Sequence, residues 1–88
     1  MQGYSTNDAD VLALSALAAM LSDERRAQRF LDLSGIDTDA LRERAGDRTL
    51  LAAVLRFLEA HEPDLIAIAH AVGVKPEELV VARRTLEG

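Results

Sequence analysis

The stretch "FLEAHEPDLIAIAHAVGVKPEELVVARRTL" (residues 57–86) determines the fold, because it contains parts of three helical segments and both breaks between them. Glu62-Pro63 ends the first segment, since proline disfavours helix in the residue before it but fits a first helical turn. Gly73 suits the left-handed backbone just past a helix end, where a Cβ atom would clash. Lys75-Pro76 then opens a helix that is acidic early and basic late, as the helix dipole favours. The pattern predicts helices over 48–61, 63–72 and 76–88.

The first half of the chain carries similar helix boundaries. Asn7 can cap a helix that runs to about Leu21. Ser22 is expected to end this helix and to cap the next one, which Gly35 terminates.

A short third helix is expected next. Asp37 can cap it, Leu41 anchors it to the core, Gly46 ends it, and Asp47 starts the fourth helix. No stretch of four or more residues alternates as a strand does. The sequence therefore predicts an all-α fold, a compact bundle of about six short helices.

The two halves of the chain resemble each other. Gly35 and Gly73 are offset by 38 residues, and the same offset pairs Leu17 with Leu55 and Leu41 with Leu79. Two interpretations stay open at this point. The chain contains two similar three-helix units, or it contains two helical hairpins that are alike because both stop at a glycine.

The length of 88 residues suits one domain that is large enough to bury a core. We expect a flexible N-terminal segment over residues 1–7 and a single helical domain over residues 8–88. The helical spacing of large apolar residues predicts the buried set, which comprises Leu17, Phe30, Leu41, Leu55, Phe57 or Leu58, Ile68 and Leu79.

Composition narrows the cellular context. The chain has no cysteine, so disulfides and cysteine-based metal sites are excluded and a reducing cytoplasm is expected. The net charge of −5 argues against a general attraction to nucleic acid or anionic membranes. The run "VLALSALAAML" (11–21) resembles a signal peptide, but acidic residues precede it and it is far shorter than the roughly 20 residues that span a bilayer. It is expected to be a buried helix, and no membrane association is predicted.

Five short motifs lie along the chain: Arg29-Phe30-Leu31, Leu33-Ser34-Gly35, Leu41-Arg42, Val54-Leu55-Arg56-Phe57-Leu58 and Pro76-Glu77. In these motifs the sequence resembles a known family, the small alphaproteobacterial proteins of domain-of-unknown-function family 3572. The resemblance covers residues 12–87, with departures at Thr38 and at Ser22-Asp23-Glu24, where the family often has proline. It implies a small helical cytoplasmic protein and carries no activity with it.

No catalytic, cofactor or metal-binding constellation stands out. His61 and His70 are nine residues apart, so they cannot form the paired metal ligands that share one helix face. The paired carboxylates all fall at helix starts, where capping and the helix dipole account for them. The chain is therefore not expected to be an enzyme or to need a cofactor. A deep pocket that holds either histidine beside carboxylates would reopen that question.

A helix-turn-helix nucleic-acid binder is the alternative function. "LSGIDTDALRERAGD" (33–47) resembles a turn and a recognition helix, from which Arg42, Arg44 and Arg48 could reach phosphates or bases. Arg25, Arg26 and Arg29 form a second basic cluster. Acidic residues alternate with these arginines, so the local charge is near zero and phosphate contacts gain little. Nucleic acid is therefore an unlikely partner.

The chain has more apolar helix surface than a domain this small can easily enclose. Ser15 is the sole polar residue from Val11 to Leu21, and His70 is the sole polar residue from Leu65 to Val72. Either the first and fourth helices form a tight central pair, or one apolar face continues onto a partner. The leading hypothesis is a non-catalytic protein-interaction module that self-associates. The first helix is its expected contact surface, through Leu14, Met20 and Leu21.

Overall fold

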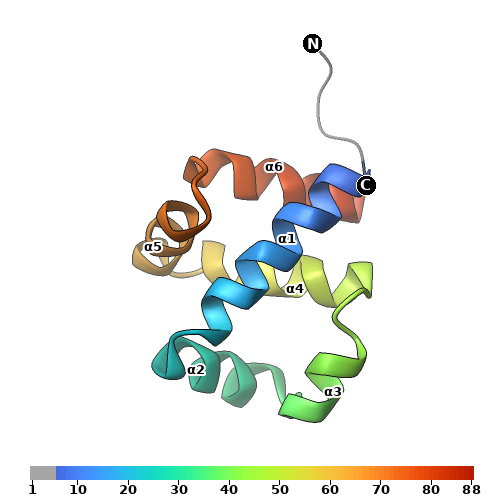
Figure 1. Ribbon diagram of the computed structural model, residues 1–88, viewed down its shortest axis with the longest axis vertical. Coiled ribbons are helices and arrows are strands. Elements are labelled where there is room, and N and C mark those ends of the chain that lie inside the picture. The colour runs from blue at the N-terminus through green and yellow to red at the C-terminus, as the bar shows by residue number, and fades with distance from the viewer. Residues whose placement is uncertain (1–5) are drawn as a thin grey trace.

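A computed structural model of the chain describes residues 6–88, and all its regular elements are α-helices (Figure 1). No residue in that range lies in a strand, which confirms the all-α prediction. Of the expected flexible segment, residues 1–5 lie outside the described residues. Asn7 belongs to the first helix rather than preceding it. The helices are α1 (Thr6–Leu21), α2 (Glu24–Ser34), α3 (Thr38–Glu43), α4 (Arg48–Glu59), α5 (Glu62–Val72) and α6 (Pro76–Glu87).

The cap of α2 differs from the prediction. Asp23, not Ser22, is the N-cap residue, and its carboxylate accepts hydrogen bonds from the backbone N–H groups of Arg25 (3.0 Å) and Arg26 (3.2 Å). The Ser22 hydroxyl instead donates to the carbonyl of Ala18, 3.0 Å away in the last turns of α1. Ser22 therefore belongs to the end of one helix and Asp23 to the start of the next.

The predicted start of α3 is confirmed and its predicted end is wrong. Asp37 caps the helix as expected, with its carboxylate 2.8 Å from the backbone nitrogen of Ala40. Gly46 does not end it, because α3 already stops at Glu43. A turn follows, in which the backbone N–H of Asp47 donates to the carbonyl of Arg44 at 2.8 Å. Asp47 then caps α4 as predicted.

Both predicted glycine stops are confirmed. Gly35 ends α2 with φ of 74°, and Gly73 ends α5 with φ of 80°. Both lie in the left-handed region, which costs glycine little because it has no Cβ atom. Among residues 6–88 no other residue has a positive φ.

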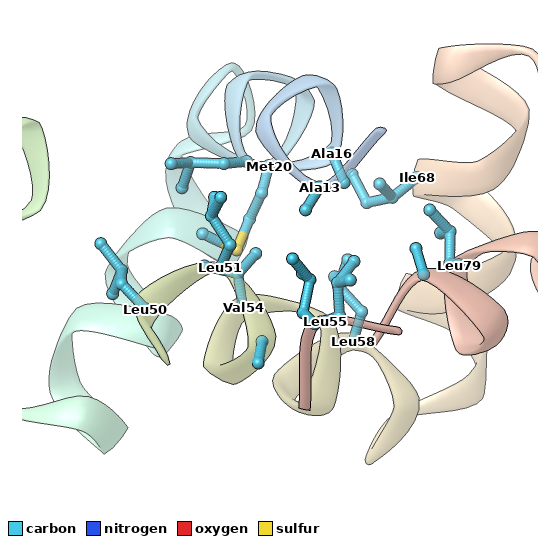
Figure 2. Close-up of a cluster of buried hydrophobic side chains, with 14 of the residues drawn as sticks. Ala13, Ala16, Met20, Leu50, Leu51, Val54, Leu55, Leu58, Ile68 and Leu79 are labelled. Carbon is cyan, nitrogen blue, oxygen red and sulfur yellow. The ribbon is translucent and has the colours of Figure 1, made fainter. Parts of the chain in front are cut away.

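The core lies where α1 crosses α4, with α5 and α6 packed against both (Figure 2). Ala13, Ala16 and Met20 of α1 point toward the leucines of α4. The small alanines let the helix backbones approach closely, which is how the nearly all-apolar segments fit into so short a chain. Every residue of the predicted buried set is buried, Leu58 rather than Phe57 filling the position left open between them.

The two halves share helix boundaries but not packing. The helix α5 begins 38 residues after α2 begins and ends 38 residues after α2 ends. The same offset separates the ends of α1 and α4 and the starts of α3 and α6. The helix α6, however, packs against α1, α4 and α5, whereas α3, whose Leu41 is buried in the core, packs less extensively against the other helices of residues 6–88. The short α3 therefore stands away from α1 at one end of the molecule (Figure 1).

Candidate functional site

The outward face of α1 is apolar and exposed. Val11, Leu14 and Leu21 keep 66%, 46% and 40% of their surface exposed, and Ala18 between them is exposed as well. We call Val11, Leu14, Ala18 and Leu21 the α1 seam. Met20, expected to belong to this surface, is instead fully buried against α4. It lies one residue before Leu21, about 100° around a helix of 3.6 residues per turn, and so faces the core.

A groove of about 210 Å³ lies beside this seam, between α1 and α3. Buried Leu17 and Leu41 lie at its base, since both line the groove while exposing almost no surface. Leu14, Ala18 and Leu21 line it from α1, and Ala45 follows from the turn after α3. The groove exists because α3 is too short to pack along α1 as α6 packs along α4.

Arg42 is the sole charged residue among those that line the groove. Its side chain is exposed, and it has no ion-pair partner among residues 6–88. The groove thus offers apolar side chains with one cation at the edge. Such a surface can receive aliphatic side chains from a helix, as helix-in-groove recognition does.

The arginines of the nucleic-acid hypothesis are not brought together. Arg44 pairs with Asp47, with Nη2 3.0 Å from Oδ2. Arg48 reaches the other end of the chain and donates to the carbonyl of Leu86 at 2.9 Å. Arg42 alone of the three stands free at the groove, on a helix of six residues.

Two of the three arginines of the second basic cluster, Arg26 and Arg29, pair with a buried carboxylate. Asp64 in the first turn of α5 is 3% exposed, and its Oδ1 accepts a hydrogen bond from Nε of Arg26 at 2.7 Å. Arg29 donates to its other carboxylate oxygen, and the Arg29 guanidinium also lies over the Phe57 ring, 5.5 Å from the centroid. Arg26 also reaches Asp23 at 2.6 Å. These contacts join α2 to α5 and leave little net positive charge.

His61 lies beside this carboxylate but does not sit in a deep pocket. Its Nδ1 is 3.1 Å from Oδ2 of Asp64, while 57% of the imidazole side chain stays exposed. The nearest hollow, of about 240 Å³, is lined by Asp23, Asp64 and the arginines of α2, and not by His61. His70 is exposed in the last turn of α5.

A larger hollow of about 650 Å³ lies between α4 and the end of α6. Its charged residues already have partners: Arg56 pairs with Glu87, and Arg48 donates to backbone carbonyls of α6. Arg83, beside it, pairs with Glu59 at 2.5 Å and with Glu87 at 2.7 Å, and these carboxylates raise its pKa. The ionic contacts fasten α6 to α4.

Among residues 6–88, no group of three or more histidine, aspartate and glutamate side chains is placed to hold a metal ion. No helix in this range has both the length and the apolar character needed to cross a membrane.

Asp64 was not singled out from the sequence, yet it is buried and holds two arginines. Its spacing of 38 residues from Arg26, which equals the internal offset, was the available signal. The groove at Arg42 had no signal in the sequence, because it depends on how far α3 stands from α1.

The fold and the groove define a small all-helical protein with an open apolar surface. Residues 6–88 match the family model described as "Protein of unknown function (DUF3572)". The match covers nearly the whole chain, so the protein belongs to this family, as the motifs of the sequence indicated. No curated protein and no solved structure matches the chain.

Proposed function

We propose that this protein is a non-catalytic protein-interaction module whose binding surface is the groove between α1 and α3. The observation that carries the proposal is the continuous apolar surface formed by Leu14, Ala18 and Leu21 at the rim with Leu17 and Leu41 below them. Exposed apolar patches rimmed by polar residues mark interaction sites in small proteins.

The occupant that fits this surface is an amphipathic helix. Aliphatic side chains spaced at i, i+3 or i+4, and i+7 reach one face of such a helix and can enter the groove in register. Arg42 at the edge can pair with a carboxylate near one end of such a helix. Each leucine buried in the groove contributes about 1.5–3 kcal/mol before the costs of association.

The non-catalytic part of the proposal is supported by the Asp64 cluster. Asp64 and His61 are the pair that most resembles an acid–base dyad, yet both carboxylate oxygens are held by guanidinium groups. The cluster therefore links α2 to α5, and the Asp64 carboxylate is not free to act as a base. The cysteine-free composition supports a cytoplasmic location.

Affinity capture from cells of the source organism tests the proposal. The baits are the unaltered chain, Leu14→Lys within the groove, and Leu33→Lys as a control on α2, where the side chain is 74% exposed. The proposal is supported by a protein that the unaltered chain and Leu33→Lys retain and Leu14→Lys does not. Calorimetry with the purified protein should then give similar affinities for the unaltered chain and Leu33→Lys and a weaker one for Leu14→Lys. Capture that does not differ between Leu14→Lys and Leu33→Lys contradicts it.

A further inference from the structure

We infer that the helix that occupies the groove is α1 of a second copy of this chain, so that two α1 helices pair antiparallel in a twofold dimer. This inference rests on the proposed function and names the partner. In such an isologous contact the same surface serves on both copies, so one interface fills two grooves.

The spacing of the α1 seam is that of a helix-pairing surface. Val11, Leu14, Ala18 and Leu21 follow one another at intervals of three, four and three residues, which is the a/d spacing of coiled coils. An exposed helix that needed no partner would carry polar residues at these positions. The seam is instead apolar at all four, with exposed fractions that reach 66% at Val11.

Large and small residues of the seam complement each other when the helices run antiparallel. In that orientation the a and d positions of opposite helices face each other. Leu14 of one copy then lies against Ala18 of the other, and Val11 lies against Leu21. The small side chain of Ala18 leaves room for Leu14 to approach the groove above Leu17 and Leu41. The surface thus carries both the protruding residues and the space that receives them.

The charges around the seam favour the same orientation. No charged residue lies from Val11 to Leu21, so the seam itself is free of repulsion although each copy has a net charge of −5. Asp8 lies at the N-terminal end of α1, and exposed Arg25 follows its C-terminal end with no ion-pair partner among residues 6–88. An antiparallel pair brings Asp8 of each copy toward Arg25 of the other. A parallel pair would place the acidic ends together.

The charges contribute less to the stability of the dimer than burial of the α1 seam does. Glu24 precedes Arg25 and is also exposed, which reduces the local positive charge. Electrostatic complementarity in interfaces sets orientation more than affinity. We therefore expect burial of the leucines to hold the dimer together and the charges to select the antiparallel arrangement.

Sedimentation equilibrium of the purified chain over a wide concentration range tests the dimer. The expected mass is twice that of one chain at the upper end of the range. Leu14→Lys and Leu21→Lys should each weaken the dimer by tenfold or more, because a lysine ammonium would be buried at the seam. Leu33→Lys, equally charged but outside the seam, should leave the dissociation constant unchanged. Circular dichroism melting of each variant verifies that it is folded.

Cross-linking tests the orientation, since the natural chain has no cysteine to interfere. The double variant Leu14→Cys/Ala18→Cys should form covalent dimers on mild oxidation, because antiparallel pairing places each new thiol opposite the other. The single variant Leu14→Cys should form far fewer. Equal cross-linking by the single variant would indicate a parallel pair and overturn the orientation.

The test of the dimer separates the two proposals. A chain that stays monomeric at all concentrations overturns the inference of a second copy. The capture experiment then decides alone whether the groove binds another protein. If the chain is monomeric and Leu14→Lys captures the same proteins as Leu33→Lys, both the dimer and the binding groove are overturned.

Discussion

Arg26 and Asp64 occupy corresponding positions in the two three-helix segments, and they form an ion pair that joins those segments. Nε of Arg26 lies 2.7 Å from Oδ1 of Asp64, and the two residues are 38 positions apart. Gly35 and Gly73 have the same offset, and both end their helices in the left-handed conformation. The ion pair therefore links α2 and α5, the two helices whose boundaries correspond at both ends.

The correspondence stops at the level of single helices. After Gly73, α6 continues to Glu87 and covers both α1 and α4. After Gly35, α3 ends at Glu43 and leaves α1 open. The groove is thus the consequence of six helical residues in one segment against twelve in the other. The two segments share local geometry but differ in structural role. The second segment closes the core, and the first leaves a surface exposed.

Loss of the Asp64 charge should destabilise the protein. Asp64→Asn leaves Arg26 and Arg29 without their shared anion, and we expect the free energy of unfolding to fall by about 1–3 kcal/mol. Thermal melting should show a fall of roughly 4–8 °C per kcal/mol for a chain of this size.

The control for this prediction is Asp32→Asn. Asp32 is exposed and accepts one hydrogen bond from Gln28 at 2.8 Å within α2. Its substitution should change the free energy of unfolding by no more than about 0.5 kcal/mol. Equal melting temperatures for the two variants would show that the Asp64 ion pairs contribute nothing to stability.

The helix-ending glycines should respond to substitution according to their φ angle. Gly35→Ala and Gly73→Ala should each destabilise by about 1 kcal/mol, since alanine resists a positive φ. No atom lies within 4 Å of a Cβ added at either position, so the backbone alone causes the effect. Gly46 also has free space but no positive φ, and Gly46→Ala should be neutral or slightly stabilising. Urea unfolding of the three variants checks the order.

The sequence was sufficient to predict those features that depend on short-range chemistry. Gly35, Gly73, Asp37 and Asp47 act on residues within one turn, so their identity and spacing predicted the helix ends. The mistake at Ser22 has the same local origin, because a serine and an aspartate stand side by side and either can cap a helix.

Features that depend on distant residues were harder to predict. The first helix is apolar around most of its circumference, so its pattern did not show that Met20 faces the core and Leu21 the solvent. Tertiary packing against α4 decides this. The groove likewise depends on the distance between α1 and α3, which no residue spacing encodes. The apolar surplus of the first helix left two outcomes open, a tight central pair with the fourth helix or an exposed apolar face, and the structure has both an α1–α4 core and an exposed face on α1.

Truncation of a central leucine should cost far more than truncation of an exposed one. Leu55 of α4 is fully buried at the centre of the core. Leu55→Ala should lower the free energy of unfolding by about 2–5 kcal/mol through lost burial and the cavity left behind. Leu33→Ala, at a side chain that is 74% exposed, should change it by no more than about 0.5 kcal/mol. Chemical denaturation of both variants tests this, and similar midpoints would contradict the assignment of Leu55 to the core.

The capping carboxylate of α4 should make stability depend on pH in the acidic range. The pKa of Asp47 is lowered, first by the side-chain hydrogen bond from Arg44, with Nη2 3.0 Å from Oδ2, and then by the backbone N–H of Thr49. A folded-state pKa below the unfolded value means that the unfolded chain binds the proton more tightly. The stabilisation is therefore complete above the unfolded pKa, which is near 3.8, and is lost as pH falls through the folded pKa.

Asp47→Asn isolates this contribution, because asparagine also caps helices well but does not titrate in this range. The melting temperature of the unaltered chain should exceed that of Asp47→Asn at pH 7, and the gap should close as pH falls below about 4. Arg44→Gln removes the largest cause of the lowered pKa, so in that background the gap at pH 7 should be smaller. Asp23 and Glu87, whose pKa values are also lowered, remain in every variant, and their contributions cancel in the comparison. A gap that stays constant from pH 7 to well below pH 3 would show that the Asp47 charge does not stabilise the folded chain.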